Sequence, residues 1–394
     1  MTRIIEFLIA LGIVAGLFVV VGLVLPSERH MSESVETNRK MTIVYDTVNS
    51  FRRFKDWNPL VLRDPKIQFK LSGPESGKGA RIDYSSTEGY IGEGNWTITD
   101  TAKNERVEIA IEDPTKGNDK KSVFTLEPTG KNNRNVKITQ DYSVNYGWNL
   151  FGRYAGLYVS RHVGDDLKLG LSRLANMLAS VPNQDYRAAD ADGNLALKDL
   201  KLVELPAEDL LVVNAGNIDR DNETIKKSIK DNQEWIKRVM DANNLEPAGP
   251  VRIVTTDFAA DKYAFDVVQP VRKRTGAAPK ADDANAKKDA GTEAADAAAA
   301  PVADATPVAA SGEPLKVTIS GGAPVTYVRT EAHRAAFANY TGHMAGLDVA
   351  RSSLRAWAAT SGYEVTDRPY ESWKSGVDKS FSLDGNFDVY WAVK

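Results

Sequence analysis

The chain has 394 residues, too many for one ordinary hydrophobic core, so about two domains are expected. Its 42% hydrophobic and 26% charged residues are typical of globular proteins, and a net charge of −3 gives no general attraction to nucleic acid or anionic lipid. The absence of cysteine excludes disulfides, thiol catalysis and thiolate metal sites, and the four histidines form no HExxH-like pair. The sequence therefore predicts no metal, no cofactor and no nucleic-acid partner.

The first element is an apolar run at residues 7–25, "FLIALGIVAGLFVVVGLVL", which is 19 residues long and has no charge. At ~1.5 Å per residue it nearly spans a hydrocarbon core of ~30 Å. No convincing Ala-x-Ala cleavage motif follows, so residues 1–27 are predicted to be an uncleaved single-pass anchor in the inner (cytoplasmic) membrane. Arg3 favours an N-terminus inside the cytoplasm, with the other domains outside. Gly12 and Gly16 form a GxxxG pair that could hold a homodimer, although glycine is common in membrane helices.

Two changes in composition divide the rest of the chain. Residues 182–197, "PNQDYRAADADGNLAL", are small and polar and are predicted to be a linker between domains 28–181 and 198–394. Residues 275–314 are rich in Ala, Asp, Lys and Pro and contain no aromatic side chain. Such a segment cannot bury enough apolar surface to offset the entropy of ordering it, which predicts a disordered insertion in the second domain.

The first domain reads as a helix, a run of strands and a second, longer helix. Apolar residues at helical spacing predict a helix that starts near residue 41 and ends before Pro59, because the residue preceding a proline avoids helical geometry. Six short runs between residues 66 and 146, separated by turn residues, predict an antiparallel sheet. Leucines between residues 157 and 178 form one stripe of a helix long enough to lie across this sheet. The predicted fold class is α+β.

This order of elements, with the motif "FKDWNPL", resembles the START-like (SRPBCC, polyketide cyclase-like) superfamily over most of residues 32–179. The resemblance implies a helix-grip fold, in which the sheet wraps the long helix and leaves an apolar cavity for a hydrophobic small molecule or lipid. Five aromatic residues could line that cavity or could be plain core; they are Trp57, Tyr84, Trp96, Phe124 and Tyr142.

The second domain contains an internal repeat with a spacing of 122 residues. Trp235 and Trp357 are 122 residues apart, and so are "FDVVQPV" from Phe265 and "FDVYWAV" from Phe387. Each half is predicted to be strand–helix–strand–strand, with its first strand at "DLLVVNAG" or "PVTYVRT". Two such units can pack around a pseudo-twofold axis and leave a central groove.

The duplication resembles the GyrI-like effector-binding domain, which also serves as the ligand module of AraC-type and MerR-type regulators. The resemblance covers nearly all of residues 200–394 apart from the insertion. It implies a glutamate that faces the ligand groove from the first strand of the second hairpin, which by position is Glu371. It also implies a His-x-Gly-aromatic feature at the entry to the second helix, near His333, Arg334 and Phe337, although Ala335 replaces the glycine.

The stretch "DRPYESWKSG" at residues 367–376 therefore contains the principal candidate site. Strand alternation places Glu371 and Trp373 on one face, and the corresponding residues 252–255 of the first half contain no carboxylate. A partly desolvated Glu371 among aromatic rings would attract an organic cation. The further candidates for this ligand site are Tyr370, Tyr340 and Tyr390.

These observations predict a membrane-anchored protein that binds small molecules. One pocket would hold a hydrophobic ligand and the groove an amphipathic or cationic one. Two alternatives stay open. The chain could be a hydrolase in which Glu371 acts as general base on a water molecule. It could also have a structural role, with both sites closed by their own side chains. The binding role is favoured over an enzymatic one. No Ser-His-Asp arrangement can be placed in the sequence, so covalent catalysis is not supported.

Overall fold

The computed structural model of the protein describes residues 2–189, 197–258, 261–274 and 312–394. Almost all of the predicted disordered insertion, and part of the predicted linker, lie outside these residues. The chain divides into two compact units, Met1–Asp185 with Ala359–Gly362 and Tyr186–Ala358 with Tyr363–Lys394. Both units combine helices with antiparallel strands, so the α+β class is confirmed.

Helix α1 (Thr2–Val24) contains the apolar run at the N-terminus. One helix of the described residues, Arg3–Val24, is long and apolar enough to cross a membrane, with a mean hydropathy of 3.0. The same properties fit an anchor or a signal sequence. A methyl group added at Gly12 or Gly16 would meet no atom within 4 Å, so this surface of α1 is open and the homodimer stays a prediction.

The first unit contains a seven-stranded sheet with the order β1-β7-β6-β5-β4-β3-β2. The six strands predicted between residues 66 and 146 all form, and β1 joins the sheet beside β7. The strands are β1 (Glu28–Thr37), β2 (Gln68–Ser72), β3 (Arg81–Ser85), β4 (Glu93–Ala102), β5 (Arg106–Glu112), β6 (Asn118–Thr129) and β7 (Asn135–Asn145). The helices are α2 (Met41–Val48), α3 (Phe54–Trp57), α4 (Leu60–Arg63) and α5 (Leu150–Ala179), with a short 3-10 turn at Lys131–Asn133.

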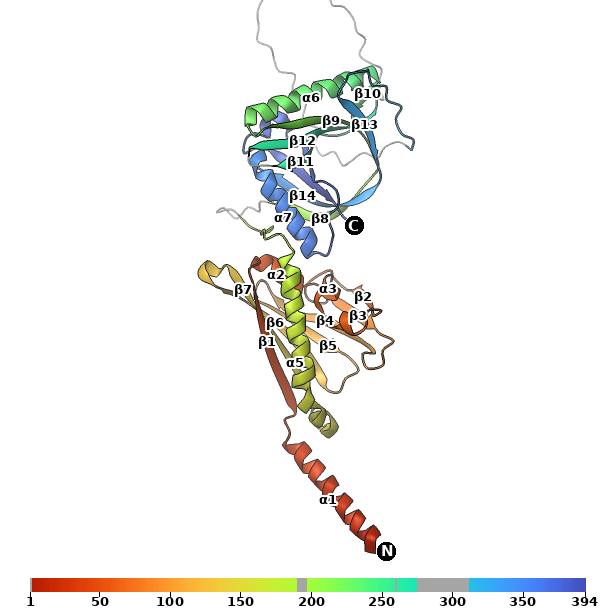
Figure 1. Cartoon of the computed structure of the whole chain (residues 1–394), viewed down its shortest axis with the longest axis vertical. Helices are drawn as coiled ribbons and strands as arrows, with labels where there is room; N and C mark the ends of the chain where they lie inside the picture. Colours follow the sequence, from red (N-terminus) through yellow and green to blue (C-terminus); the bar gives the residue numbers. More distant parts are fainter. Residues whose placement is uncertain (1, 190–196, 259–260, 275–311) are drawn as a thin grey trace, which may run out of the picture. The chain divides into compact units, whose positions relative to one another are not determined.

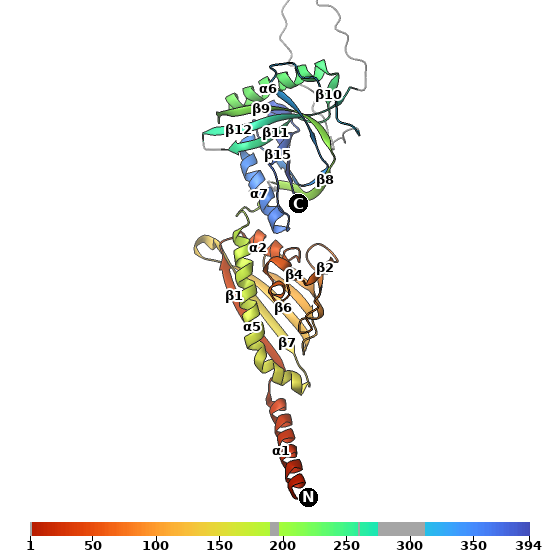
Figure 2. The ribbon, with the colours of Figure 1, turned by 45° about the vertical axis from the view of Figure 1, so that its right-hand side comes forward.

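Helix α5 is the long helix predicted from the leucine stripe, and it lies along one face of the sheet (Figures 1 and 2). Asn149 caps its N-terminus: the Asn149 side chain accepts a hydrogen bond from the Gly152 N–H and so satisfies one of the free amides of the first turn. Four of its leucines are buried against the sheet, at positions 167, 171, 174 and 178. The core of the unit therefore lies between α5 and the inward side chains of the strands.

The second unit contains one large antiparallel sheet, and the order along it is β13-β9-β12-β11-β15-β16-β14-β8, with β10 paired to β12. The strands are β8 (Leu197–Leu205), β9 (Glu208–Asp219), β10 (Leu245–Pro247), β11 (Arg252–Phe258), β12 (Lys262–Lys273), β13 (Val325–Thr330), β14 (His333–Thr341), β15 (Tyr370–Trp373) and β16 (Asn386–Ala392). The helices are α6 (Asn222–Ala242), α7 (Leu347–Thr360) and α8 (Gly376–Lys379), with a 3-10 turn at Met344–Gly346. The first half of this unit supplies β8, β9, β11 and β12 to this order, and the second half supplies β13 to β16. If each strand is replaced by its counterpart in the other half, the same order is read from the opposite end.

The predicted strand content of each half was wrong in one respect. The segment "PVTYVRT" forms β13, but β13 pairs with β9 of the first half, and the strand directly ahead of α7 is β14. Each half therefore has two strands before its helix. His333, Arg334 and Phe337 accordingly lie in a strand and not at the entry to a helix. The sequence did not predict β14 as a strand, because alanine has a low strand propensity. The alanines of β14 are in a strand because they are buried in the sheet.

The two halves also share a polar pair at matching positions of the sheet. Asn214 on β9 donates a hydrogen bond to Asp266 on β12 at 2.6 Å. Asn339 on β14 donates to Asp388 on β16 at 3.1 Å, and Asp266 and Asp388 are 388 − 266 = 122 residues apart. The same interaction at the same step of the strand order is what an internal duplication would leave.

Gly94 provides a test of the packing of the first sheet. It lies opposite Tyr84, and a Cβ at this position would overlap the Tyr84 hydroxyl and the Glu112 carbonyl oxygen. We expect Gly94→Ala to lower the free energy of unfolding by about 1–3 kcal/mol, since the closely packed wall cannot move away without strain. Urea denaturation measures the change. Gly89→Ala is the matched control, because nothing lies within 4 Å of its added methyl group, and an equal loss in both variants would contradict the packing.

Candidate functional site

A partly open cavity of about 180 Å³ lies in the first unit between α5 and the sheet. The predicted ligand-binding residues Trp57, Tyr84 and Trp96 all line it, and so does Tyr142. Phe124 is completely buried and packs edge-to-face against Trp57, with ring centroids 5.9 Å apart, so it supports the wall from behind. The structure thus brings together aromatic residues from α3 and three different strands; their contact with a ligand stays a prediction.

The corner "DWNPL" positions Trp57. Helix α3 ends there because Pro59 excludes helical geometry at Asn58, which is extended, and the Asn58 side chain accepts a hydrogen bond from the Leu60 N–H at 3.0 Å. Arg173 on α5 donates to the carbonyl oxygens of Trp57 at 3.2 Å and Asp56 at 2.9 Å. The long helix therefore both covers the cavity and fixes the corner that carries its tryptophan.

Three polar groups of the cavity wall have no protein partner. The Trp57 indole N–H is buried without a hydrogen bond. Among the described residues, the hydroxyls of Tyr84 and Tyr142 form no hydrogen bond either. Burial raises the pKa of Tyr84 to about 12 and also raises the pKa of Tyr142, and the nearby Asp113 carboxylate adds to both effects. Both phenols are therefore neutral hydrogen-bond donors at physiological pH.

The edge of the cavity is held by ionic contacts. The buried Lys120 ammonium donates to the Asp113 carboxylate at 2.5 Å and to the Thr115 hydroxyl at 2.8 Å, which closes the turn between β5 and β6. Arg63 on α4 pairs with Asp166 on α5 at 2.6 Å. These contacts fix the loops around an apolar interior while the three groups inside it stay available.

Gln140 is one of the polar residues of the wall that sequence reasoning missed. Its amide donates a hydrogen bond to the Ser122 hydroxyl at 2.9 Å, and its side chain lines the cavity. The sequence held a usable signal, because "NVKITQDYSV" alternates and residue 140 is the one polar amide among the inward positions of β7. A polar residue on the buried face of a strand indicates a polar contact inside the core.

The raised pKa of Tyr84 predicts a loss of stability at alkaline pH. A phenol whose pKa is 10 in the unfolded chain and about 12 in the folded protein holds its proton more tightly when folded. Its contribution to stability is complete below pH ~10 and is lost as the pH rises toward 12. We expect Tyr84→Phe to reduce the fall in the urea midpoint between pH 9 and pH 11. Tyr158→Phe, at an exposed ring, is the control, and an equal reduction in both variants would contradict the assignment.

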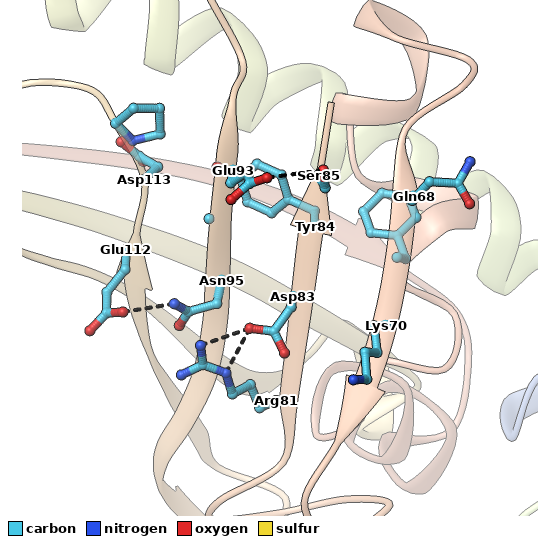
Figure 3. Close-up of a pocket in the computed structure, with 13 residues that line it drawn as sticks. Gln68, Lys70, Arg81, Asp83, Tyr84, Ser85, Glu93, Asn95, Glu112 and Asp113 are labelled. Carbon is cyan, nitrogen blue, oxygen red and sulfur yellow. Dashed lines mark hydrogen bonds and ion pairs between the residues drawn. The ribbon is translucent and has the colours of Figure 1, made fainter. Parts of the chain in front are cut away.

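A larger hollow of about 680 Å³ lies over the outer face of β2 to β5, and Figure 3 shows its side chains. Several of its polar groups are paired with one another: Arg81 pairs with Asp83 at 2.7 Å, and Asn95 donates to Glu112 at 2.7 Å. The hydrogen bond from Arg81 lowers the pKa of Asp83. Since these groups are paired and partly exposed to water, the hollow is a weaker candidate than the cavity beneath α5.

Glu371 and Trp373 share one face of β15, as strand alternation predicts, and both are buried. Glu371 is 0% exposed, and both of its carboxylate oxygens accept hydrogen bonds from Arg351 on α7, at 2.6 and 3.0 Å. Trp373 packs edge-to-face against Phe387 and Phe381. In this arrangement Glu371 has no oxygen open to an organic cation or to a water molecule, which disfavours both its binding role and the hydrolase alternative.

The first half of the second unit has isoleucines at the positions of this ion pair. Ile253 pairs with Val267 as Glu371 pairs with Val389, and these valines are 389 − 267 = 122 residues apart. Ile229 precedes Arg351 by 351 − 229 = 122 residues. Both isoleucines are completely buried. A buried charge pair in one half therefore corresponds to two aliphatic side chains in the other.

This correspondence predicts how the ion pair responds to mutation. We expect Arg351→Leu to lower the free energy of unfolding by about 3–5 kcal/mol, because Glu371 would be left buried without a counter-charge. We expect the double variant Arg351→Ile with Glu371→Ile to be about as stable as the parent or more stable, as in the other half. Urea denaturation compares the two. Lys227→Ala, at an exposed pair with Asp231, should change little, and a double variant as unstable as the single one would contradict the prediction.

The other predicted residues of the second unit lie elsewhere. Tyr370 and Tyr390 stack with ring centroids 5.0 Å apart, and the Arg252 guanidinium lies 5.1 Å from the Tyr370 ring. Arg252 forms a buried two-point ion pair with Glu208, with both distances 2.7 Å. Tyr340 stacks on Phe387 and donates a hydrogen bond to the His343 carbonyl oxygen. Glu208 is therefore the buried carboxylate beside the tyrosine pair, a neighbour that the spacing of the sequence did not reveal.

Comparisons with known proteins gave structural similarity alone. No family model matches the chain, and no curated protein matches it. Similar solved structures include norcoclaurine synthase from Thalictrum flavum, with 11% identity over 41% of this chain and 91% of that chain and a TM-score of 0.32. Ara h 8.0201 has 12% identity over 39% of this chain and 99% of that chain, with a TM-score of 0.30. The C-terminal domain of EcmrR has 16% identity over 50% of this chain and 97% of that chain, with a TM-score of 0.33.

Proposed function

We propose that this chain is a membrane-anchored protein that binds a small amphipathic molecule in the cavity between α5 and the first sheet. The observation that carries the proposal is the buried indole N–H of Trp57, a residue that lines this cavity; the N–H has no protein partner. An unpaired buried donor costs free energy, and a ligand that accepts its hydrogen bond would recover it. The length and apolar composition of helix α1 support the anchor. We place the rest of the chain outside the cytoplasm.

The size of the cavity limits the ligand. Its volume of about 180 Å³ is close to the ~150 Å³ of a protein cavity that holds benzene, and is below the ~300 Å³ of ordinary drug-sized pockets. The Trp57 N–H and the Tyr84 and Tyr142 hydroxyls are all donors. A single six-membered ring that carries a hydrogen-bond acceptor, such as a ketone oxygen, therefore fits both the volume and the polar groups. This ligand class agrees with a START-like, helix-grip role for the first unit.

We assign the second unit a GyrI-like effector-binding role within the same protein. The reversible strand order and the matched Asn214–Asp266 and Asn339–Asp388 pairs support the duplication. The stacked Tyr370 and Tyr390 rings are its best candidate contacts for an amphipathic or cationic compound. The ion pair with Arg351 leaves no carboxylate oxygen of the buried Glu371 free to act as a general base, which argues against the enzymatic alternative.

A matched pair of ligands tests the cavity. Acetophenone and ethylbenzene have nearly the same shape, but only acetophenone carries an acceptor oxygen. We expect acetophenone to raise the melting temperature of a protein comprising residues 28–394, since a ligand at ten times its Kd adds roughly 1.4 kcal/mol, at about 2–4 °C per kcal/mol. Ethylbenzene should give a smaller rise. Trp57→Phe should reduce the difference between the two ligands.

Two variants on α5 provide the control for specific binding. Val163→Phe places a larger side chain in the wall of the cavity and should abolish the shift with acetophenone. Leu169→Phe makes a comparable change at a position that is 43% exposed and outside the cavity, and should leave the shift intact. Equal shifts in the parent and in Val163→Phe would place the ligand elsewhere and overturn the proposed site.

A further inference from the structure

We propose that the start of α5 and the turn before it lie in the interfacial layer of a phospholipid bilayer, so that the first unit contacts lipid through a second surface besides α1. We call this surface, formed by Trp148, Phe151, Tyr154, Leu157 and Tyr158, the interfacial patch. The inference rests on the proposed membrane anchor. It adds a partner surface that the anchor alone does not require.

Contacts between α1 and α5 fix the depth of the patch. The Tyr154 hydroxyl donates a hydrogen bond to the Phe18 carbonyl oxygen at 2.8 Å, and the rings of these two residues stack at 4.5 Å. The Phe151 ring lies 5.1 Å from the same phenylalanine. Phe18 precedes the end of α1 at Val24 by six residues, which is about 9 Å along the helix axis. If α1 spans the bilayer, residues that contact Phe18 cannot be far from the hydrocarbon layer.

Arg153 closes the C-terminal end of α1. Its guanidinium donates to the carbonyl oxygens of Gly22 at 3.3 Å, Leu23 at 3.0 Å and Leu25 at 3.2 Å. These are carbonyls that the helix itself cannot satisfy, and a cation at this end also interacts favourably with the helix dipole. Gly22 permits the close approach, because a Cβ there would meet the Leu150 and Tyr154 side chains at 3.2–3.3 Å. The two helices are thus joined directly where the membrane segment ends.

The outward side chains of the patch are large and apolar. Trp148 is 83% exposed, Phe151 66%, Tyr158 66% and Leu157 49%. Scattered exposed apolar residues are common, but these are neighbours at helical spacing. Tryptophan and tyrosine are enriched where membrane proteins cross the interface between lipid and water. The exposed Lys116 ammonium lies 5.5 Å from the Phe151 ring, a position from which it can reach lipid phosphates.

The chain connection keeps the patch near the end of α1. Strand β1 begins at Glu28, three residues after Leu25. The Tyr146 N–H donates to the Ser27 carbonyl oxygen at 2.7 Å, which ties the turn before α5 to the same point. Figure 2 shows the end of α1 beside the start of α5. The patch is therefore continuous with the apolar surface of the anchor, which favours lipid over a second protein as its occupant.

Spin-label accessibility in the full chain tests this surface. Because the chain has no cysteine, single-cysteine variants can carry a nitroxide at one site each. The labelled positions are Gly12→Cys within α1, Trp148→Cys and Tyr158→Cys in the patch, and Leu169→Cys further along α5. The full-length variants are reconstituted in vesicles of phosphatidylcholine and phosphatidylglycerol. Collisions with oxygen, which partitions into lipid, are compared with collisions with a water-soluble nickel chelate.

We expect a several-fold higher ratio of oxygen to nickel collisions at positions 12, 148 and 158 than at 169. Low ratios at 148 and 158 with a high ratio at 12 would overturn the patch and leave the anchor intact. A low ratio at 12 would overturn both the anchor and the patch that rests on it. A high ratio at 169 would contradict the proposed limit of the patch, since that position lies about 16 Å beyond Tyr158 along α5.

Discussion

The packing of α5 against the first sheet is the contact on which the candidate site depends. Its buried leucines hold the helix on the sheet, and the cavity is the space that these side chains leave unfilled. The same helix fixes the tryptophan corner through Arg173 and holds the end of α1 through Arg153. The turn between β5 and β6 links the cavity to the proposed interfacial patch, because Thr115 lines the cavity while the adjacent Lys116 contacts Phe151 of the patch. A ligand that partitions into lipid would thus be concentrated beside the wall of its site.

The second unit uses buried charge in a different way. The Arg351–Glu371 pair lies where the other half has Ile229 and Ile253, so the fold of a half does not need the charges. If the two halves arose by the proposed duplication, one half acquired or kept the ion pair, and the other half has two isoleucines at the same positions. Such a pair adds little stability beyond an aliphatic pair, but both charges must be present together. Its position between β15 and α7 makes it a constraint on the geometry of one half only.

Much of the fold could be predicted from the sequence because its patterns are local. Alternation along "NVKITQDYSV" and the leucine stripe of α5 reflect a buried face at a fixed period, which any single segment displays by itself. The alanines of β14 display no such period, so its pairing with β16 and β8 had to come from the structure. Glu371 is the clearest limit. Its own strand predicts its face correctly, but its partner Arg351 is 20 residues away on a helix, and no local pattern reveals that contact. The shared place of Trp57, Tyr84 and Trp96 in one cavity was predicted from the family resemblance and not from any local pattern.

The indole N–H resonance of Trp57 gives the most direct test of a ligand in this cavity. Of the seven tryptophans, Trp57 combines a place in the cavity wall with a buried N–H that has no partner. The measurement is a proton–nitrogen correlation spectrum of residues 28–394 during titration with acetophenone, with the Trp57 signal assigned by its loss in Trp57→Phe. A saturable downfield shift of that signal, as expected for a newly formed hydrogen bond, is the result that the account predicts. An unchanged Trp57 signal at saturating ligand would contradict it.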